Sequence, residues 1–321
     1  MMSVKVAVVG TGKISEIMMK ESFHCDAFET VAVVSRSIET AKSFADRYSL
    51  KSVYHDIDSV IADKNIDAVY IATPNSTHCK YTIELLRGGK HVLCEKPIAS
   101  DSGEAEEMYT VAKQNNKVLL EAMRTAYRSG LNTLKNLIEE WGRPVHAILK
   151  GCQYSSRYDT FKRGRYTNTF NPQLSNAAVM DLGVYCIRLM LELFGKPNKV
   201  MSSGTTLKNG FEAGGSIIAE YGDMTAELIY SKVSNSYSPS EIQFEKGGVL
   251  IGDIMGLHDI SIFNSMGEIV TVDDENLDYV PVMKRFCELI SSAGDFDRER
   301  ELTIETMRII DEVRSQRDIY F

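Results

Sequence analysis

Residues 4–15 read Val4-Lys5-Val6-Ala7-Val8-Val9-Gly10-Thr11-Gly12-Lys13-Ile14-Ser15, and they set the fold class for the rest of the chain. An apolar, β-branched run ends in two spaced glycines, and apolar residues then recur at helical spacing. A strand, a glycine turn and a helix in this order are typical of a dinucleotide-binding βαβ unit. In such a unit Gly10 makes the tight turn, and Gly12 lets the backbone approach a pyrophosphate at the helix N-terminus.

The third position of the glycine pattern is Ser15, a small residue that permits close helix–strand packing without ensuring it. The alternative interpretation is a glycine turn that binds no nucleotide. Because strand, turn and helix occur together, we favour nucleotide binding.

A second predicted strand, Thr30–Ser35, ends in Ser35-Arg36-Ser37. Domains that bind NAD usually carry an acidic residue near this place, where it holds the ribose hydroxyls. Here the strand tip has no acid, and Glu39 comes only in the next helix. A guanidinium can bind a 2′-phosphate through paired, charge-assisted hydrogen bonds, whereas a carboxylate would repel it. We therefore predict NADP as the cofactor, with NAD as the alternative if Arg36 is only a solvated surface residue.

Strands and helices continue to alternate up to residue 122, through predicted strands such as Asp67–Ala72 and His91–Cys94. This alternation predicts right-handed βαβ units and a doubly wound parallel sheet. In the second half an apolar helix, about Ala178–Phe194, is followed by short strands with Gly-Asp, Gly-Gly and Asn-Ser turns, which suit antiparallel pairing. We predict an α/β protein with a dinucleotide-binding Rossmann domain at 1–122 and an α+β domain at 123–321.

The composition excludes several classes of protein. A net charge of -8 argues against a general nucleic-acid-binding protein. No apolar run approaches the ~18 residues of a membrane span, and no signal peptide precedes the first strand. Six scattered cysteines without a CxxC pair fit free thiols in a reducing cytosol, and none of the six histidines lies in a metal-spaced cluster. We expect a cytoplasmic protein without a metal, a nucleic-acid partner or a membrane association.

Four short motifs occur in a fixed order: GTGKIS (Gly10–Ser15), ATPNSTH (Ala72–His78), CEKP (Cys94–Pro97) and MDLGVY (Met180–Tyr185). Each is weak alone, but the ordered set resembles the glucose–fructose oxidoreductase, inositol dehydrogenase and rhizopine-catabolism (Gfo/Idh/MocA) family over essentially the whole chain. The resemblance implies a nicotinamide-dependent oxidoreductase with an open-faced, mainly antiparallel C-terminal sheet that binds substrate and often makes dimers. It therefore leads us to expect a homodimer or a higher homo-oligomer.

The resemblance also implies roles for single residues. It places the ATPN segment against the cofactor and makes Lys96 of the EKP motif catalytic. Most members end the last motif in D-x-x-x-H, whereas here Asp181 is followed by Tyr185 at the place of the histidine. This variant resembles the NADP-using branch of dimeric dihydrodiol dehydrogenases and some aldose dehydrogenases, where the pair is Lys and Tyr. The chain also departs from the family at 176–178, where Asn-Ala-Ala replaces a Gly-Gly pair.

Hydride transfer to or from a nicotinamide leaves the protein to handle a proton on the substrate oxygen. Tyr185 lies four residues after Asp181, so both side chains can face one site. A phenol is a poor base at neutral pH, and a neighbouring ammonium, here Lys96, favours its ionised form. We predict Lys96 and Tyr185 as an acid–base pair and Asp181 as an orienting residue. The alternatives are a tyrosine buried on an apolar helix and an aspartate that serves as a cap or an ion-pair partner.

The leading hypothesis is an NADP-preferring oxidoreductase that interconverts an alcohol and a carbonyl on a sugar, a cyclic polyol or a trans-dihydrodiol. One alternative is a glycoside-cleaving relative that keeps NAD bound and uses hydride transfer transiently; the missing histidine and Arg36 count against it. Another is a non-catalytic NADP-binding regulatory protein, which would need the glycine turn but neither Lys96 nor Tyr185.

The residues predicted to bind the cofactor are Gly10, Thr11, Gly12, Lys13, Ile14, Ser35, Arg36, Ala72, Thr73, Pro74, Asn75, His78, Glu95, Lys96 and Arg124. The residues predicted to bind the substrate are Lys96, Tyr154, Tyr158, Arg165, Asp181 and Tyr185. For Tyr154, Tyr158 and Arg165 a solvated basic loop is the alternative.

Overall fold

The computed structural model describes residues 3–264, 266–267, 269–272, 277–292, 294 and 296–321. The chain forms two compact units. The first consists of Met1–Met123 and Leu277–Ile304, and the second of Arg124–Asn276 and Glu305–Phe321. The domain boundaries expected from the sequence remain a prediction, and the structure adds that residues 277–304 belong to the first unit.

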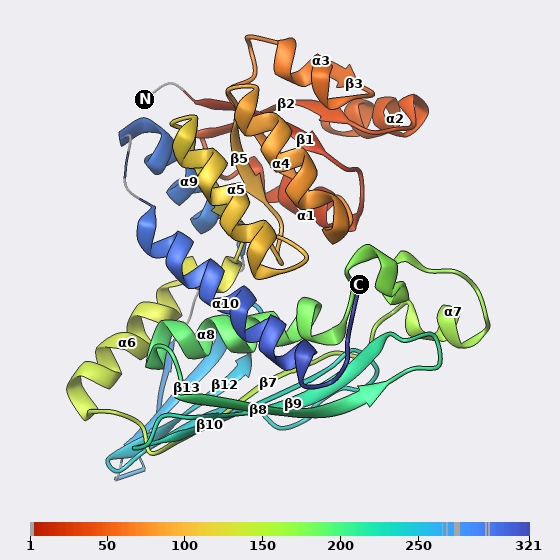
Figure 1. Ribbon diagram of the computed structural model, residues 1–321. Coiled ribbons are helices and arrows are strands. Elements are labelled where there is room, and N and C mark those ends of the chain that lie inside the picture. Colours follow the sequence, from red (N-terminus) through yellow and green to blue (C-terminus); the bar gives the residue numbers. More distant parts are fainter. Residues whose placement is uncertain (1–2, 265, 268, 273–276, 293, 295) are drawn as a thin grey trace. The chain divides into compact units, whose positions relative to one another are not determined.

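The first unit is built on a six-stranded parallel sheet with the strand order β3-β2-β1-β4-β5-β6 (Figure 1). The order reverses between β1 and β4, and open α/β sheets bind ligands beyond the carboxyl ends of their strands at such a point. The predicted doubly wound parallel sheet is confirmed. The strands are β1 (Val4–Val9), β2 (Phe28–Val34), β3 (Ser52–Tyr54), β4 (Ala68–Ile71), β5 (His91–Cys94) and β6 (Leu119–Glu121).

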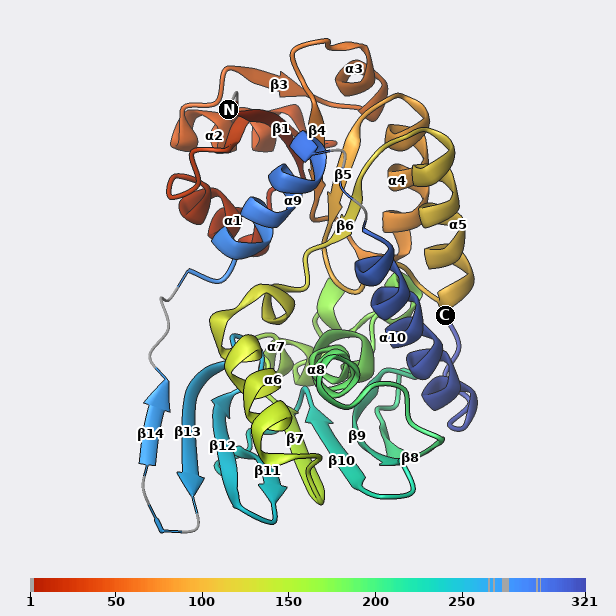
Figure 2. The same cartoon turned by 90° about the vertical axis from the view of Figure 1, so that its left-hand side faces the viewer.

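Helices cover both faces of this sheet, because the side chains of its central strands are buried on both sides. Figure 2 shows α4 and α5 on one face and α1 and α9 on the other. The helices of this unit are α1 (Lys13–Ser22), α2 (Ile38–Tyr48), α3 (Ile57–Ala62), α4 (His78–Arg87), α5 (Ser102–Gln114) and α9 (Val280–Ser292). Helix α10 (Asp297–Ser315) begins in the first unit and ends in the second.

Helix α9 belongs to the first unit although it follows the whole second sheet in the chain. The Tyr279 N–H, just before the helix, donates to the Glu21 carboxylate at 2.6 Å. The Cys287 thiol donates to the Ala27 carbonyl at 3.2 Å. These contacts fasten α9 beside α1 and β2.

The second unit is built on an eight-stranded sheet with the order β14-β13-β12-β11-β7-β10-β9-β8 (Figure 1). Strands β7 and β10 pair in parallel, and the other neighbouring pairs are antiparallel. The predicted large, mainly antiparallel sheet is therefore confirmed. The strands are β7 (His146–Cys152), β8 (Lys199–Thr206), β9 (Glu212–Glu220), β10 (Thr225–Ser231), β11 (Ser240–Phe244), β12 (Gly247–Asp253), β13 (His258–Asn264) and β14 (Ile269–Val272).

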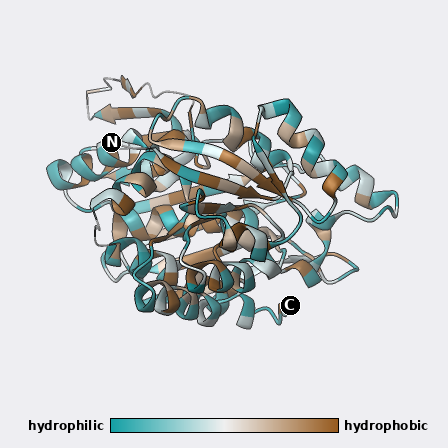
Figure 3. Ribbon diagram, turned by 90° about the horizontal axis from the view of Figure 1, so that it is seen from above, coloured by the Kyte–Doolittle hydropathy of each residue, from teal (hydrophilic) through white to brown (hydrophobic). Residues whose placement is uncertain are grey.

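Helices cover one face of this second sheet. Buried and half-buried residues alternate along β7 and β10, as expected where only one face is packed. Helices α6 (Ser129–Trp141) and α8 (Val184–Phe194) and the later part of α10 lie over the packed face, and α7 (Tyr158–Lys162) lies in a loop after β7 (Figure 1). Figure 3 shows helices that mix hydrophilic and hydrophobic residues, as expected of helices with one side against a sheet.

No helix in the described part of the chain combines the length and the hydropathy that a membrane crossing requires.

Candidate active site

The glycine turn has the predicted geometry of strand, turn and helix. Gly10 follows β1 and donates its N–H to the Val34 carbonyl at 3.0 Å, and Gly12 is the N-cap of α1. Gly10 has a φ of +109°, and a Cβ there would stand 2.5 Å from the Ala72 carbonyl oxygen. Both the conformation and the space therefore require glycine at this position.

The start of α1 is open and fits the phosphates of a dinucleotide. In the described part of the chain, a Cβ on Gly12 would meet no atom within 4 Å, and glycine has no side chain to cap the first N–H groups of the helix. Ser15 is fully buried in the first turn, and its hydroxyl has no hydrogen-bond partner among the described residues. A helix N-terminus with unpaired N–H groups attracts anions. Thr11 is half-buried beside this opening, and Lys13 and Ile14 are exposed; contact of all these residues with a cofactor stays a prediction.

The tip of β2 offers a guanidinium. Ser35 donates its N–H to the Tyr54 carbonyl at 3.2 Å, and the exposed Arg36 follows it. Within the described chain Arg36 forms no hydrogen bond or ion pair. The next acid, Glu39, accepts a 2.9 Å hydrogen bond from Ser37. Its own backbone N–H and the Ser37 hydroxyl lower the pKa of Glu39. The carboxylate is thus occupied in the helix start, whereas Arg36 is available for a phosphate.

The ATPN turn after β4 is connected to the EKP turn by His78. Residues Ala72, Thr73 and Pro74 lead into a 3-10 turn, Asn75–Thr77, and His78 begins α4. The ring nitrogens of the fully buried His78 lie 2.9 Å from the Pro97 carbonyl oxygen and 3.0 Å from that of Thr73. Burial lowers the pKa of His78, and the two carbonyl contacts oppose this shift. His78 therefore holds two turns of the same sheet edge together, and its direct contact with a cofactor stays a prediction.

The EKP turn follows β5 at the same edge of the sheet. Its glutamate, Glu95, is buried and supports the turn through hydrogen bonds. The Glu95 carboxylate accepts hydrogen bonds from the hydroxyls of Tyr70, at 2.6 Å, and of Tyr279, at 2.7 Å. It also accepts the Lys96 N–H at 3.2 Å. Burial, and next to it the charge of Glu95, raise the pKa of Tyr70 well above its usual value. Glu95 thus fixes the backbone that presents the half-buried Lys96.

In the second unit, Asp181 lies in a π-helical turn, Val179–Gly183, directly before α8. The sequence predicted one regular helix here, and such π turns occur frequently at functional sites. The Asp181 carboxylate pairs with Lys232, and these side chains are 38% and 11% exposed. Lys232 follows β10 and belongs to no motif, so no sequence pattern singles it out. The ion pair holds the carboxylate in place, which fits an orienting role.

Tyr185 is buried in the first turn of α8, and its hydroxyl accepts a 3.1 Å hydrogen bond from Arg124. The guanidinium carbon of Arg124 lies 5.8 Å from the centre of the tyrosine ring. Arg124 was predicted from the sequence as a cofactor-binding residue, and that contact stays a prediction. The structure adds a cation that donates directly to the predicted catalytic phenol.

The three predicted substrate-binding residues of the loop after β7 lie in or beside an aromatic cluster. The hydroxyl of Tyr154 donates to Asp159 at 2.8 Å and accepts from Lys162 at 2.9 Å, and the Tyr154 and Tyr158 rings lie 5.5 Å apart. Arg165 is exposed in the following segment. The loop carries charges and aromatic faces, and its role in substrate binding stays a prediction.

Lys96 belongs to the first unit, whereas Asp181 and Tyr185 belong to the second. Their predicted pairing therefore stays a prediction. No three His, Cys, Asp or Glu side chains of the described residues are grouped so that they could hold a metal ion.

Comparison with known proteins gives the family. A family model described as an oxidoreductase family with an NAD-binding Rossmann fold matches residues 4–123. A second model, the GFO/IDH/MocA C-terminal domain, matches residues 132–250. The solved structure of aldose-aldose oxidoreductase from Caulobacter crescentus shares the fold, with a TM-score of 0.87, 20% identity and 98% of each chain covered.

Two curated relatives differ in how much of the chain they match. Scyllo-inositol 2-dehydrogenase (NADP(+)) IolU of Bacillus subtilis is 36% identical over 99% of this chain and 98% of its own length. Trans-1,2-dihydrobenzene-1,2-diol dehydrogenase of Xenopus laevis is 24% identical over 72% of this chain and 70% of its own length. The chain is 36% identical to the Bacillus subtilis relative over nearly its whole length, and it matches one family model at residues 4–123 and another at 132–250. The chain therefore belongs to the Gfo/Idh/MocA family of oxidoreductases.

Proposed function

We propose that the protein is an NADP-dependent dehydrogenase that interconverts a ring alcohol and its ketone on a cyclic polyol or a sugar. The observation that carries the proposal is the likeness, along 99% of the chain, to a scyllo-inositol 2-dehydrogenase that uses NADP(+). A second relative is named for a cyclic trans-diol. The feature common to these two named substrates is a six-membered ring with hydroxyls on neighbouring carbons.

The residues at the edge of the first sheet fit this cofactor. The open N-terminus of α1 would hold the pyrophosphate, since no Cβ stands at Gly12 and a Cβ at Gly10 would collide with Ala72. The exposed Arg36 would hold the 2′-phosphate by paired, charge-assisted hydrogen bonds. When bound, the nicotinamide supplies or accepts the hydride.

Tyr185 would exchange the proton of the substrate hydroxyl in the proposed reaction. A group that does so must stand within hydrogen-bond reach of the reacting oxygen, and a nearby cation favours the phenolate that accepts the proton. Arg124 already donates to the phenol oxygen, and Lys96 would supply the second cation. Asp181, held by Lys232, would accept a hydrogen bond from a substrate hydroxyl and so orient the ring.

The loop after β7 would complete the substrate site. Its tyrosine rings suit the apolar face of a sugar ring, and Arg165 and Lys162 suit hydroxyl oxygens. The uncovered face of the second sheet would join two copies of the chain into a homodimer. The six free thiols suit a reducing compartment, so we place the protein in the cytoplasm.

The decisive test measures the absorbance of NADPH or NADH with the purified protein, NADP+ or NAD+, and a panel of inositols, aldoses, trans-dihydrodiols and glycosides. We expect turnover of at least one cyclic polyol, with NADP+ preferred over NAD+. Tight NADPH binding without turnover of any substrate would indicate a sensor and contradict the proposal. Release of an alcohol from a glycoside at constant NADPH would indicate glycoside cleavage instead.

A further inference from the structure

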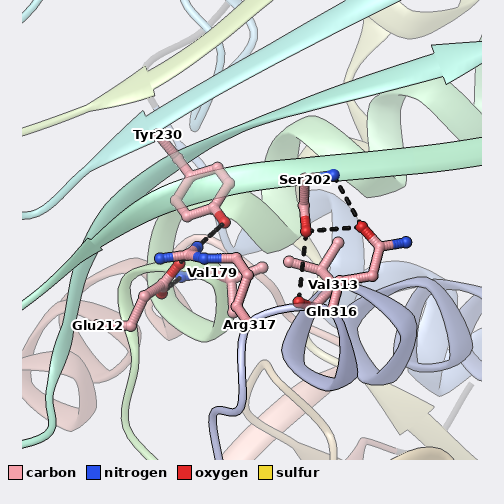
Figure 4. A network of polar contacts seen from close by, with 7 residues as sticks. All are labelled: Val179, Ser202, Glu212, Tyr230, Val313, Gln316 and Arg317. Carbon is pink, nitrogen blue, oxygen red and sulfur yellow. Dashed lines mark hydrogen bonds and ion pairs between the residues drawn. The ribbon is translucent and has the colours of Figure 1, made fainter.

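A buried carboxylate on β9, Glu212, lies against the π-helical turn of the second unit. Its side chain is 0% exposed, and that of its partner Arg317 is 7% exposed. One carboxylate oxygen accepts the Val179 N–H at 2.7 Å. The other accepts the Tyr230 hydroxyl at 2.9 Å and a guanidinium nitrogen of Arg317, as Figure 4 shows. Three donors from three distant parts of the chain thus converge on one acid.

The sheet is shaped to admit the guanidinium of Arg317. Gly204 on β8 and Gly215 on β9 are paired across the two strands. A Cβ on Gly204 would stand 2.4 Å from the guanidinium carbon, and one on Gly215 would stand 2.7 Å from a guanidinium nitrogen. Glycine inside a strand weakens a sheet, so two opposed glycines mark a place where another group must approach the backbone. Here that group is Arg317.

The network holds both ends of the π-helical turn. At its start, the Val179 N–H is one of the donors that a helix cannot satisfy itself, and the N-cap residue Ala178 offers no side-chain hydrogen bond. Glu212 caps this end from a neighbouring strand, and its negative charge suits a helix N-terminus. At the other end, a Cβ on Gly183 would stand 3.2 Å from the ring of Tyr230, so the ring lies directly against the backbone.

We propose that Arg317 is a positioning residue which, through Glu212 and Tyr230, fixes the turn that carries Asp181 and leads into Tyr185. The inference rests on the acid–base role proposed for Tyr185. One guanidinium nitrogen of Arg317 donates to the Tyr230 hydroxyl at 3.1 Å as well as to Glu212. A lysine ammonium has donors for both contacts, but its side chain is shorter than that of arginine, so it would restore them only in part. The last residues of the chain thereby determine the geometry of a helix more than a hundred residues earlier.

The test compares Arg317→Met and Arg317→Lys with a matched control, Gln316→Ala. Gln316 lies at the same end of α10 and accepts the Ser202 N–H at 2.8 Å (Figure 4), away from the Glu212 carboxylate. The measurements are kcat and KM for the polyol and NADP+, and amide hydrogen exchange of peptides that span 176–190. Arg317→Met should accelerate exchange at 179–185 and lower kcat by ~10- to 100-fold, because a misplacement of about 1 Å can cost 100-fold. The KM for NADP+ should stay unchanged, Arg317→Lys should recover part of kcat, and Gln316→Ala should behave as wild type.

Wild-type exchange at 179–185 in Arg317→Met would overturn the proposal, and so would faster exchange spread evenly over the second unit. If Arg317→Met does not fold, the double variant Glu212→Gln with Arg317→Met removes both buried charges, and the same exchange criterion applies to it. If the wild-type protein turns over no polyol, the proposed function fails, while the exchange at 179–185 still decides the positioning role.

Discussion

The two units place their candidate functional side chains by different means. In the first unit, Gly10, Arg36 and Lys96 stand just beyond the ends of parallel strands, so the pairing of the strands brings them to one edge of the sheet. In the second unit, Asp181 and Tyr185 lie on a helical segment over a sheet, where ion pairs and hydrogen bonds from distant segments hold them. In the first unit, each side chain is positioned mainly by the strand directly before it in the sequence. In the second unit, side chains are positioned by partners distributed over the chain.

This difference predicts how substitutions combine. Residues presented by separate strand ends should act independently of one another, because substitutions without shared partners usually add. Residues that share a network should show strong coupling, because each one fixes the geometry of the next. The following experiments test this contrast, beginning with the largest expected effect.

Lys96→Met should abolish detectable turnover and leave NADPH binding intact. The loss of a positioned acid–base or charge contribution is worth ~100- to 10,000-fold in rate. Steady-state kcat and fluorescence titration with NADPH measure the two effects, and Lys80→Met, at an exposed position on α4, is the control. Substantial residual kcat would remove Lys96 from the catalytic assignment.

Tyr185→Phe should lower kcat by at least ~100-fold, and Arg124→Met should lower it by ~10-fold. The double variant should be no slower than Tyr185→Phe alone, because Arg124 donates to the oxygen that this substitution removes. The kcat values of the four proteins form the test. If the fold losses in kcat of the two single variants multiply in the double variant, the two residues act separately. That result would contradict the coupling expected in the second unit.

Arg36→Asp should move the cofactor preference from NADPH towards NADH. The loss of hydrogen bonds to a charged phosphate corresponds to ~10- to 100-fold in KM for NADPH. Its kcat for the bound cofactor should change little if the strand ends act independently. Unchanged KM values for both cofactors would refute the assignment of Arg36.

Tyr279→Phe should lower the free energy of unfolding by ~1.5–3 kcal/mol, because a buried carboxylate loses one of its donors. Denaturant unfolding measures the loss, and Tyr320→Phe, at an exposed tyrosine, is the control. A small effect on kcat is expected, since Tyr70 still donates to Glu95. A large fall in kcat with an unchanged free energy of unfolding would mean that distant residues also position the functional side chains of the first unit.

Acid should weaken the first unit through His91, on β5. Its Nδ1 accepts the Val118 N–H at 3.0 Å, and burial lowers the pKa of His91 from 6.5 to about 4. The unfolded chain binds this proton more readily, so the contribution to stability is complete above about pH 6.5 and is lost as the pH falls towards about 4. The Tm of wild type should fall more steeply over this range than that of His91→Asn, whose side chain can still accept the hydrogen bond. Parallel curves for the two proteins would contradict the assignment.

The sequence predicted the first unit well because its signals are local. A run such as Val4–Val9 followed by Gly10 announces a buried strand and its turn within a few residues, and the order of motifs reproduces the order of strand ends. Glu95 was predicted only as a cofactor-binding residue, which stays a prediction. Its supporting role was not foreseen, because its partners Tyr70 and Tyr279 come from separate parts of the chain. The apolar run His91–Cys94 before Glu95 gives no sign of these two hydrogen-bond partners.

In the second unit, the sequence identified the candidate residues Asp181 and Tyr185 but not the side chains that surround them. The run from Ala178 to Phe194 is apolar throughout, so its periodicity could not separate the π-helical turn from the following helix. Strand β8 is rich in Ser, Thr and Gly and lies at the sheet edge, and its pattern resembles that of a loop. Lys232 and Arg317 are single cations that only the tertiary fold gives a partner.

The return of α9 to the first unit also constrains how the protein can be divided. A fragment that stops at residue 123 would lack α9 and would bare Ala27 and the side of α1 that this helix covers. A self-sufficient nucleotide-binding fragment would need residues 277–304 joined to it by a linker in place of the second sheet.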